Sequence, residues 1–267
     1  MSLTEKALVV IPTYNESANI RPLVEEILQQ SEGVHVLVVD DASPDGTGEI
    51  VDDLCAECDG RVFCIHREGK LGLGTAHIAG FTYGGDQGYG RVVTMDGDRS
   101  HSPSYLPEML AAAERFDMVI GSRYAPGGGL LNWPLHRRLL SLWANMFTRA
   151  LLRLPVADCT SGYRCYSKEV LDTVEPGNVR GSGYSFLEQM VWKVHTAGFR
   201  VGEVPIIFKD RHAGASKIDK SEVFRAAWHV LATAIAPPSV PKRRSGKRLG
   251  DASLGGASRR VRPGGSR

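Results

Sequence analysis

The stretch Arg91-Val92-Val93-Thr94-Met95-Asp96-Gly97-Asp98 joins a buried-strand pattern to an acidic end. Its first residues form an almost continuous apolar run, which is typical of a strand in a parallel sheet that helices cover on both faces. Ligands of such sheets bind at the carboxyl ends of the strands, and Asp96 and Asp98 are expected there. We expect Gly97 to permit the sharp turn that brings both carboxylates to one point.

Two carboxylates at this position indicate a site for a hard divalent cation. Mg²⁺ and Mn²⁺ prefer oxygen ligands and typically take one or two carboxylates together with substrate phosphates and water. The alternative is a solvated turn whose aspartates cap the next helix. An Asp-x-Asp pattern does not decide between the two, and the neighbouring segments favour the ligand site.

Three earlier segments repeat the pattern of an apolar run with a polar end. Strands are predicted at 7–11, 34–39 and 62–65, and each is followed by a helical pattern; Ser17 can cap the first helix, and the third is expected at 75–83. Strands and helices thus alternate about every thirty residues, which predicts right-handed βαβ units in a doubly wound, mostly parallel sheet.

The ends of these strands place candidate ligand groups along one edge of the sheet. Tyr14 and Glu16 follow the first strand, Asp41 follows the second, and a glycine-rich loop with Arg67 and Lys70 follows the third. The amides and charges of such a loop suit an anion. No Gly-x-Gly-x-x-Gly follows the first strand, which argues against a hydride-transfer enzyme.

Charge is distributed unevenly along the 267 residues, of which 42% are hydrophobic. Residues 1–240 carry 23 basic and 29 acidic groups, a net −6, whereas 241–267 carry nine Lys/Arg against one Asp, a net +8. We predict one α/β domain over 1–240 and a disordered basic tail over 241–267. The tail suits an anionic membrane, or serves only solubility; without interleaved aromatics it does not predict nucleic-acid binding.

The five cysteines do not form the framework of a secreted disulfide-rich protein. Cys55-x-x-Cys58 lies on a helical pattern, where helix packing is favoured over a zinc or redox role. The amino-terminal residues do not resemble a signal peptide, and no run of ~18 apolar residues predicts a membrane span.

Two amphipathic helices are predicted near 134–153 and 221–237, after a flexible joint at Gly127-Gly128-Gly129. In the first helix, apolar residues recur at three- and four-residue steps, with Arg137, Arg138 and Trp143 among or beside them. This composition suits the lipid–water interface. The alternative is an ordinary helix that covers the sheet.

Several motifs now resemble one family. They are Val10-Ile11-Pro12-Thr13-Tyr14-Asn15-Glu16, Val39-Asp40-Asp41-Ala42-Ser43-Pro44-Asp45-Gly46-Thr47 and Met95-Asp96-Gly97-Asp98, followed by Gly121-Ser122-Arg123-Tyr124, Asp158-x-Thr160-Ser161-Gly162-Tyr163-Arg164, Gly183-Tyr184-Ser185-Phe186 and Arg211-x-x-x-Gly214-x-Ser216-Lys217. They resemble the inverting glycosyltransferases of family 2, which have a GT-A (Rossmann-like) fold. The Ser-Pro-Asp-Gly-Thr segment narrows the resemblance to the polyprenol-phosphate (dolichol-phosphate) mannose synthases, over about residues 7–220.

The resemblance implies a role for individual residues. Asp96 and Asp98 would hold the metal and the diphosphate, with Ser100 as a further metal ligand, and Asp41 would bind the base or ribose. Arg99 departs from the family, which usually has an apolar residue there; its charge either aids phosphate binding or points outward. His101 is expected to lie behind the metal ligands or on the surface, which is favoured over its being a ligand. The implied sets are catalytic Asp96, Asp98 and Arg123; donor-binding Pro12, Tyr14, Glu16, Val39, Asp41, Lys70, Met95, Asp96, Gly97, Asp98, Arg123, Arg211 and Lys217; and, at the acceptor and membrane interface, Arg137, Arg138, Trp143 and Ser216.

The implied activity is metal-dependent transfer of mannose, with Mg²⁺ or Mn²⁺, from GDP-mannose to a polyprenyl monophosphate with inversion. The product would be a lipid-linked mannose donor for glycan or glycolipid synthesis and protein mannosylation, made by a peripheral enzyme on the cytoplasmic face of a membrane. Some family members use a separate transmembrane anchor subunit, so such a partner is expected. The alternatives are a UDP-hexose-dependent transferase and a non-catalytic nucleotide-sugar-binding subunit.

The chemistry of the acceptor makes a further prediction. A phosphate monoester has its second pKa near ~6 and is largely dianionic at pH 7, so it needs no general base. The protein must instead bring two anions together and screen their repulsion, which is severe in a dry site. We therefore expect cations around one acid pair, and no obligatory catalytic base.

Overall fold

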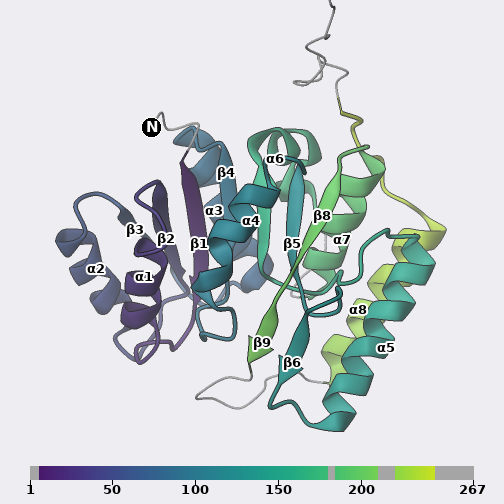
Figure 1. Ribbon diagram of the computed structural model, residues 1–267, viewed down its shortest axis with the longest axis horizontal. Helices are drawn as coiled ribbons and strands as arrows, with labels where there is room; N and C mark the ends of the chain where they lie inside the picture. Colours follow the sequence, from purple (N-terminus) through teal and green to yellow (C-terminus); the bar gives the residue numbers. More distant parts are fainter. Residues whose placement is uncertain (1–5, 180–183, 210–219, 244–267) are drawn as a thin grey trace, which may run out of the picture.

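The protein is built around one seven-stranded sheet. The computed structural model describes residues 6–179, 184–209 and 220–243 (Figure 1). The strand order is β3-β2-β1-β4-β7-β5-β8, and β7 runs antiparallel to its neighbours β4 and β5 while the other pairs are parallel. This confirms the predicted mostly parallel sheet. The strands are β1 (Ala7–Thr13), β2 (Val34–Asp40), β3 (Val62–His66), β4 (Arg91–Thr94), β5 (Met118–Ser122), β7 (Arg164–Ser167) and β8 (Val201–Pro205).

Helices cover both faces of the sheet, because alternate residues of its central strands are buried on opposite sides. Val9 and Ile11 of β1 belong to a core with α1, α2 and α4, whereas Leu8 and Val10 belong to a core with α3, α6 and α7. The helices are α1 (Ile20–Leu28), α2 (Thr47–Glu57), α3 (Leu73–Asp86), α4 (Leu106–Ala112), α5 (Leu135–Leu152), α6 (Lys168–Val174), α7 (Tyr184–Thr196) and α8 (Lys220–Ile235).

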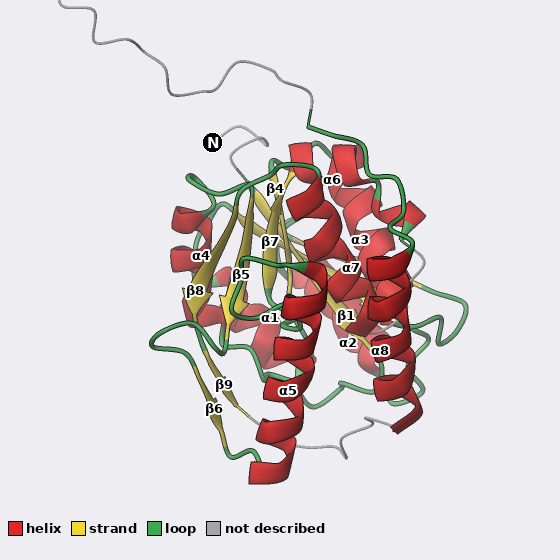
Figure 2. Cartoon of the chain, turned by 90° about the vertical axis from the view of Figure 1, so that its right-hand side faces the viewer, coloured by secondary structure: helices red, strands yellow, loops and turns green. Residues whose placement is uncertain are grey.

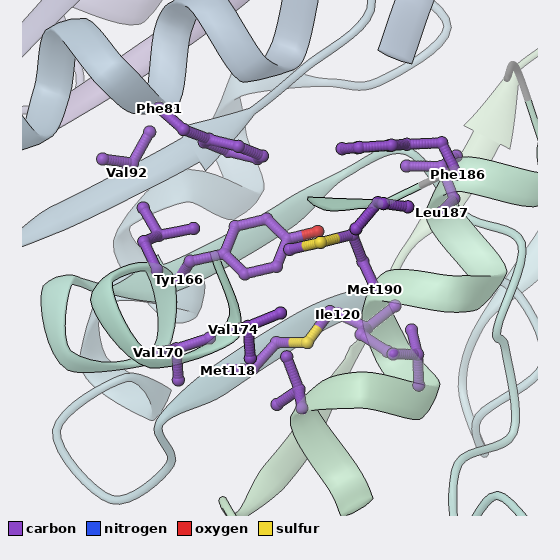
Figure 3. Packing of buried hydrophobic residues seen from close by; sticks show 14 of the residues in the cluster. Phe81, Val92, Met118, Ile120, Tyr166, Val170, Val174, Phe186, Leu187 and Met190 are labelled. Atoms are coloured by element: carbon purple, nitrogen blue, oxygen red, sulfur yellow. The ribbon is translucent and has the colours of Figure 1, made fainter. Parts of the chain in front are cut away.

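Strand β7 contributes to both cores. Tyr166 is fully buried on the α3 and α7 side, where its ring lies edge-on to that of Phe81 with centroids 5.2 Å apart. Figure 3 shows this ring among side chains of β4, β5, α6 and α7. Its neighbour Cys165 is buried on the opposite face. Arg164 is tolerated in the centre of the sheet because its guanidinium group donates to the carbonyl oxygens of Ser161, Leu187 and Cys159 at 2.6 to 2.7 Å.

Close packing of α3 on the sheet brings the glycine-rich loop to the carboxyl edge. A Cβ atom at Gly80 would lie 2.3 Å from Cγ1 of Val10, so the helix backbone rests directly on β1. The helix begins at Leu73, two residues before its predicted start, and the loop that precedes it therefore ends beside the carboxyl ends of β1 and β2.

Two local predictions are wrong. Ser17 does not cap α1, whose N-cap residue is Asn19; instead the Ser17 amide donates to Asp45 at 3.0 Å and ties two loops together. The three glycines are no flexible joint, because Gly129 begins strand β6 (Gly129–Leu131), which pairs with β9 (Ile207–Lys209). A Cβ atom at Gly128 would lie 2.5 Å from the carbonyl oxygen of Ser122, so this segment packs tightly.

Helices α5 and α8 lie side by side at one end of the molecule, and both extend away from the sheet (Figures 1 and 2). Their bounds agree with the helices predicted near 134–153 and 221–237. Within the described ranges, no helix is both long and apolar enough to cross a bilayer.

The folded body extends past the predicted boundary at residue 240. The Arg243 backbone amide donates to the carbonyl oxygen of Ala197 at 3.0 Å, and its guanidinium group pairs with Glu169 at 2.9 Å. These contacts tie Arg243 to the folded body, and the boundary between body and tail stays a prediction. The rest of the predicted basic tail, 244–267, lies outside the described residues.

Candidate active site

The predicted acid pair opens onto a cleft at the carboxyl ends of the strands. The cleft has a volume of about 200 Å³ and is bordered by residues of β1, β9, α3, α5 and α7 and of the loops that follow β4 and β5. Several predicted site residues are therefore brought together, although they lie far apart in the sequence. The predicted residues that line the cleft are Pro12, Glu16, Asp96, Gly97, Asp98, Arg123 and Arg137.

The turn that presents the pair differs from the prediction. Arg99, not Gly97, adopts the left-handed conformation, with φ of 61°. Gly97 serves close packing instead, because a Cβ atom there would lie 3.3 Å from Cγ2 of Thr13 and 3.4 Å from the carbonyl oxygen of Pro12. The acid pair is thus held against the end of β1.

Arg99 points away from the cleft. Its guanidinium group pairs with Glu26 of α1 in a short contact between Nη2 and Oε1. Of the two readings that the sequence left open, phosphate binding or an outward direction, the structure supports the second.

The residues around Asp98 fit a hard divalent cation. Asp98 is 5% exposed, and one of its carboxylate oxygens accepts a hydrogen bond from the Ser100 amide at 3.0 Å. The Ser100 hydroxyl is buried and has no hydrogen-bond partner among the described residues. Two carboxylates and an unsatisfied hydroxyl form an oxygen-rich donor set, which suits Mg²⁺ or Mn²⁺.

His101 is buried beside the pair and borders the cleft. Its Nδ1 accepts a hydrogen bond from the Asp96 amide at 3.3 Å, and burial lowers the pKa of the imidazole. A ring that accepts at Nδ1 carries its single proton on Nε2, an atom with no hydrogen-bond partner among the described residues. The ring also packs against Tyr163 and Phe208, so it supports the wall of the cleft.

The end of β1 is fixed by hydrogen bonds to the loop after β2. Asp40 accepts hydrogen bonds from the Thr13 hydroxyl at 2.8 Å and from the Ser43 amide at 2.9 Å. The Glu16 carboxylate accepts a hydrogen bond from Asn19 at 2.8 Å. Together with the hydrogen bond from the Glu16 amide to the Thr47 hydroxyl at 3.0 Å, these contacts tie segments 12–16 and 40–47 into one rigid edge.

Asp41 organises the glycine-rich loop. It is buried, and its carboxylate pairs with Arg67 and accepts a hydrogen bond from the Gly72 amide at 3.1 Å. Beside it, the Lys70 ammonium group lies 4.1 Å from the centre of the Tyr14 ring. The predicted donor-side residues Tyr14, Asp41 and Lys70 therefore form one neighbourhood.

Two predicted donor-binding residues have buried side chains. Val39 and Met95 are both 0% exposed and lie in the two hydrophobic cores. Their side chains pack inside the protein, which leaves the backbone as the only part of either residue that can face a ligand.

Arg123 is held by a buried ion pair that the sequence did not predict. Its Nε and Nη2 atoms donate to the two carboxylate oxygens of Asp158 at 2.7 and 2.8 Å, and both side chains are buried. Burial alone would raise the pKa of Asp158, but the charge and hydrogen bonds of Arg123 lower that pKa to about 2. The pair is therefore ionised throughout the neutral range.

Aromatic rings join the site to the start of α5. Trp133 lies edge-on to Phe208 with centroids 5.6 Å apart, and the guanidinium carbon of Arg137 lies 3.8 Å from the Trp133 ring centre. Arg137 borders the same cleft as the acid pair. The neighbouring Arg138 instead donates to the carbonyl oxygen of Leu130 at 2.8 Å. In the sequence, Trp133 is recognisable only as the residue before Pro134, and this position predicted no role for it in the site.

Helix α5 exposes most of its large apolar side chains, and it buries two polar side chains beside the apolar Leu152. Trp143 and Met146 are each 57% exposed, whereas Asn145 and Thr148 are buried. The inner side chains bind the protein body: Ser141 accepts from the Tyr124 hydroxyl at 2.7 Å, and Thr148 donates to Glu188 at 3.3 Å. The exposed large apolar residues of this helix are Leu135, Leu139, Leu140, Leu142, Trp143 and Met146.

Glu188 of α7 is buried under α5 without full compensation. Only Oε1 accepts the Thr148 hydrogen bond, and Oε2 has no partner among the described residues. Burial raises the pKa of Glu188 to about 7, against the smaller opposing effects of Thr148 and the charge of Arg164. Because the folded state holds this proton more tightly than the unfolded state does, stability falls as the pH rises from the ordinary value of 4.5 towards 7.

Replacing Glu188 by glutamine is expected to remove this loss, because the amide keeps the shape and is never charged. From the shift between 4.5 and about 7, the free energy of unfolding at pH 8 should rise by ~3 kcal/mol at most relative to the parent protein. At pH 4 the two proteins should be nearly equal. Urea unfolding at both pH values checks this, and an equal difference at both would contradict a raised pKa.

Three of the predicted site residues are not among the described residues. Arg211, Ser216 and Lys217 fall in 210–219, outside the described residues.

A larger cavity, of about 870 Å³, lies at the amino ends of β1, β2 and β4. Its described lining includes a single carboxylate, Glu114, so it lacks the acid pair that makes the smaller cleft chemically competent.

The sheet and the cleft together define a class of protein. A mostly parallel sheet that gathers an acid pair, a glycine-rich loop and cationic side chains at its carboxyl edge is the arrangement of a GT-A glycosyltransferase. The chain belongs to glycosyl transferase family 2, whose family model matches residues 8–175.

Curated relatives extend the similarity over most of the chain. A polyprenol monophosphomannose synthase from Mycolicibacterium smegmatis is 44% identical over 228 residues, covering 85% of this chain and 86% of the relative. An undecaprenyl-phosphate mannosyltransferase from Micrococcus luteus is 40% identical over 231 residues, covering 86% and 95%.

Solved structures support the fold. Glucosyl-3-phosphoglycerate synthase from Mycobacterium tuberculosis, in complex with Mn²⁺, UDP and glucosyl-3-phosphoglycerate, matches with a TM-score of 0.61 and 20% identity over 89% of this chain and 81% of its own. A mannosyltransferase from Pyrobaculum calidifontis, in complex with GDP-Man and Mn²⁺, matches with a TM-score of 0.55 and 17% identity over 88% and 66%. The predicted GT-A fold is thus confirmed.

Proposed function

We propose that this protein transfers mannose from GDP-mannose to a polyprenyl monophosphate, with a divalent cation bound at Asp96 and Asp98. One observation carries the proposal: a single cleft is bordered both by the acid pair and by Arg137, from a helix whose outer face is apolar. A nucleotide-sugar site and a lipid-facing surface therefore meet at one place. The names of the two curated relatives support the sugar and the lipid acceptor.

The chain's own residues would perform the binding and orientation. The rigid edge made by Pro12, Glu16 and Asp41 is placed for the nucleoside, and Asp96 and Asp98 are placed for the diphosphate with its cation. When bound, the cation supplies Lewis-acid stabilisation of the departing nucleoside diphosphate. Arg123, fixed by Asp158, adds a preorganised positive charge that costs no reorganisation during the reaction.

The acceptor phosphate would enter from the α5 side of the cleft. Arg137 is placed to attract it, beside the rings of Trp133 and Phe208 that line the cleft. A dianionic phosphate oxygen is nucleophilic without loss of a proton, so its attack on the sugar carbon leaves no work for a base. Attack opposite the leaving diphosphate inverts that carbon.

The proposal also places the protein on a membrane surface. Leu139, Trp143 and Met146 of α5 are largely exposed, as are Trp228 and Ile235 of the adjacent α8. Apolar residues gathered on neighbouring helices are suited to insertion among lipid headgroups and upper acyl chains. The cytoplasmic face, the peripheral state and a separate anchor subunit are part of this proposal.

Product analysis tests the proposed reaction. Purified protein is incubated with labelled GDP-mannose or UDP-glucose, Mg²⁺ or Mn²⁺, and a short polyprenyl phosphate. Mannolipid should form only from GDP-mannose and only with a divalent cation, and chelation should stop it. Glucolipid in place of mannolipid would favour the UDP-hexose alternative, and nucleotide binding without any product would favour the non-catalytic subunit.

Removing apolar area from α5 is expected to weaken membrane binding. Leu139 and Trp143 are each 57% exposed, so replacing both by alanine should leave the fold intact. The lost burial in lipid is ~2 kcal/mol or more, so binding to vesicles that contain anionic lipid should fall by about 30-fold. Vesicle sedimentation measures this.

Activity with two acceptors provides the comparison. Transfer to a short, soluble polyprenyl phosphate should stay within about threefold, whereas transfer to a long-chain acceptor in vesicles should fall with binding. Asp172→Ser on α6, in a surface ion pair with Lys168, is the matched surface control and should change neither. Unchanged vesicle binding by the double variant would contradict the proposed lipid-facing surface.

A further inference from the structure

Asn145 connects α5 to the segment before β7. It is 0% exposed and lies on the inner side of α5. Its amide nitrogen donates to the carbonyl oxygen of Ala157 in a short hydrogen bond, and its amide oxygen accepts from the Cys159 amide at 2.9 Å. One side chain thus holds the backbone on both sides of Asp158.

Asp158 is the residue that fixes Arg123. Both of its carboxylate oxygens accept from the Arg123 guanidinium group, and Oδ2 also accepts from the Arg123 backbone amide at 3.0 Å. A carboxylate that binds an arginine at two atoms fixes the plane and direction of the guanidinium group. The orientation of Arg123 therefore depends on where the backbone holds Asp158.

The same backbone segment is anchored on its other sides by the sheet. Glu203 of β8 accepts hydrogen bonds from the amides of Ala157 and Asp158 at 2.7 and 2.9 Å. Arg164 of β7 donates to the carbonyl oxygen of Cys159 at 2.7 Å. Among these anchors, Asn145 provides the one that comes from α5, the helix with the apolar outer face.

A second contact ties α5 to the same place. Tyr124, the residue after Arg123, donates from its hydroxyl to Ser141, one turn before Asn145. Arg123 is thus linked to α5 through its chain neighbour and through its ion-pair partner. A shift of α5 would therefore move the Arg123 guanidinium group through both sets of contacts.

We propose that Asn145 is a positioning residue for the transfer reaction, holding Asp158 so that Arg123 faces the phosphates in the cleft. The inference rests on the proposed function, in which Arg123 supplies positive charge to the reacting groups. An amide is required because the site needs one donor and one acceptor in a small side chain. Aspartate would lose the donor and place a second buried carboxylate next to Asp158.

The test is a double-mutant cycle in the full-length protein, with GDP-mannose, Mn²⁺ and a short polyprenyl phosphate. Asn145→Leu keeps the size and removes the three side-chain hydrogen bonds, one to Ala157 and two from Cys159. We expect it to lower kcat about 30-fold while the KM for GDP-mannose stays within about threefold, because the nucleoside edge is formed by other segments. Arg123→Ala should lower kcat more, and adding Asn145→Leu to it should have little further effect.

Thr148→Val separates positioning from a loss of stability. It removes a different buried hydrogen bond of α5, to Glu188, and leaves the Asp158 segment untouched. It should lower the melting temperature by an amount similar to that of Asn145→Leu, with kcat within about threefold. Asn145→Ser replaces the leucine variant in the same cycle if the latter does not fold.

Each result of the cycle either supports or overturns the positioning role of Asn145. A 30-fold loss that persists when Arg123 is already alanine would overturn the positioning role and leave the proposed function standing. An Arg123→Ala enzyme with unchanged transfer would overturn both the role of Arg123 and that of Asn145. Loss of kcat by Thr148→Val equal to that of the Asn145 variant would show a general effect of α5 and also overturn the proposal.

Discussion

Replacement of Asp98 by alanine is expected to abolish transfer, with a loss of at least about 10³-fold in kcat/KM. Asp98 is nearly buried, is oriented by the Ser100 amide and lines the cleft beside Asp96. Removing it takes away one of two carboxylates that would hold the cation, which contributes several kcal/mol of charge stabilisation in such reactions. Initial rates with saturating Mn²⁺, and Mn²⁺ affinity by calorimetry, measure the two consequences.

Arg99→Asn is the matched control for this variant. It changes the next residue in the chain, asparagine tolerates the left-handed backbone found there, and the lost ion pair with Glu26 points away from the cleft. Its kcat/KM should stay within about threefold. An Asp98→Ala protein that bound Mn²⁺ with unchanged affinity and still formed product would remove the acid pair from the mechanism.

Replacement of Asp158 by alanine is expected to cause the largest loss of stability, ~3–5 kcal/mol, because it leaves the Arg123 charge buried without its partner. Since the pKa of Asp158 is lowered to about 2, the contribution is fully present above the ordinary value of 3.8 and disappears only as the pH falls from there towards 2. Urea unfolding at pH 7 measures the loss.

Two further variants show whether the loss of stability is specific to the buried ion pair. Asp172→Ala removes a carboxylate from an exposed pair with Lys168, and it should cost less than about 1 kcal/mol. Asp158→Leu combined with Arg123→Met replaces the buried pair by apolar groups; it should recover most of the stability and none of the transfer. A loss below about 1 kcal/mol for Asp158→Ala would mean that the pair is accessible to water.

The early part of the fold could be predicted because each strand carries its own signal. The runs that became β1 to β4 are apolar, and their polar ends fall at one edge because parallel strands share a direction. Strand β7 has no such signal: Arg164 heads a four-residue segment, and its place in the sheet depends on pairing with β4 and β5, which are remote in sequence. Long-range pairing of this kind cannot be read from local pattern.

The site was predictable in its residue types and less so in its connections. Asp96, Asp98 and Arg123 do line one cleft, but the partner of Arg123 lies far along the chain at Asp158. The periodicity of α5 predicted a helix without stating which side faces the protein. Asn145 and Thr148 determine which side of α5 faces inward, because polar side chains are buried where the protein body offers matching donors and acceptors.

The ion pair between Arg123 and Asp158 also joins the two ends of an excursion from the sheet, residues 123–158. The chain leaves β5 at Arg123, forms β6 and α5, and returns at Asp158 shortly before β7. The nucleoside edge is formed outside this excursion, by segments 12–16 and 40–47. Evolution can remodel this excursion, whose helix has exposed apolar side chains, in length or in sequence for acceptors of different size while the sugar donor stays the same.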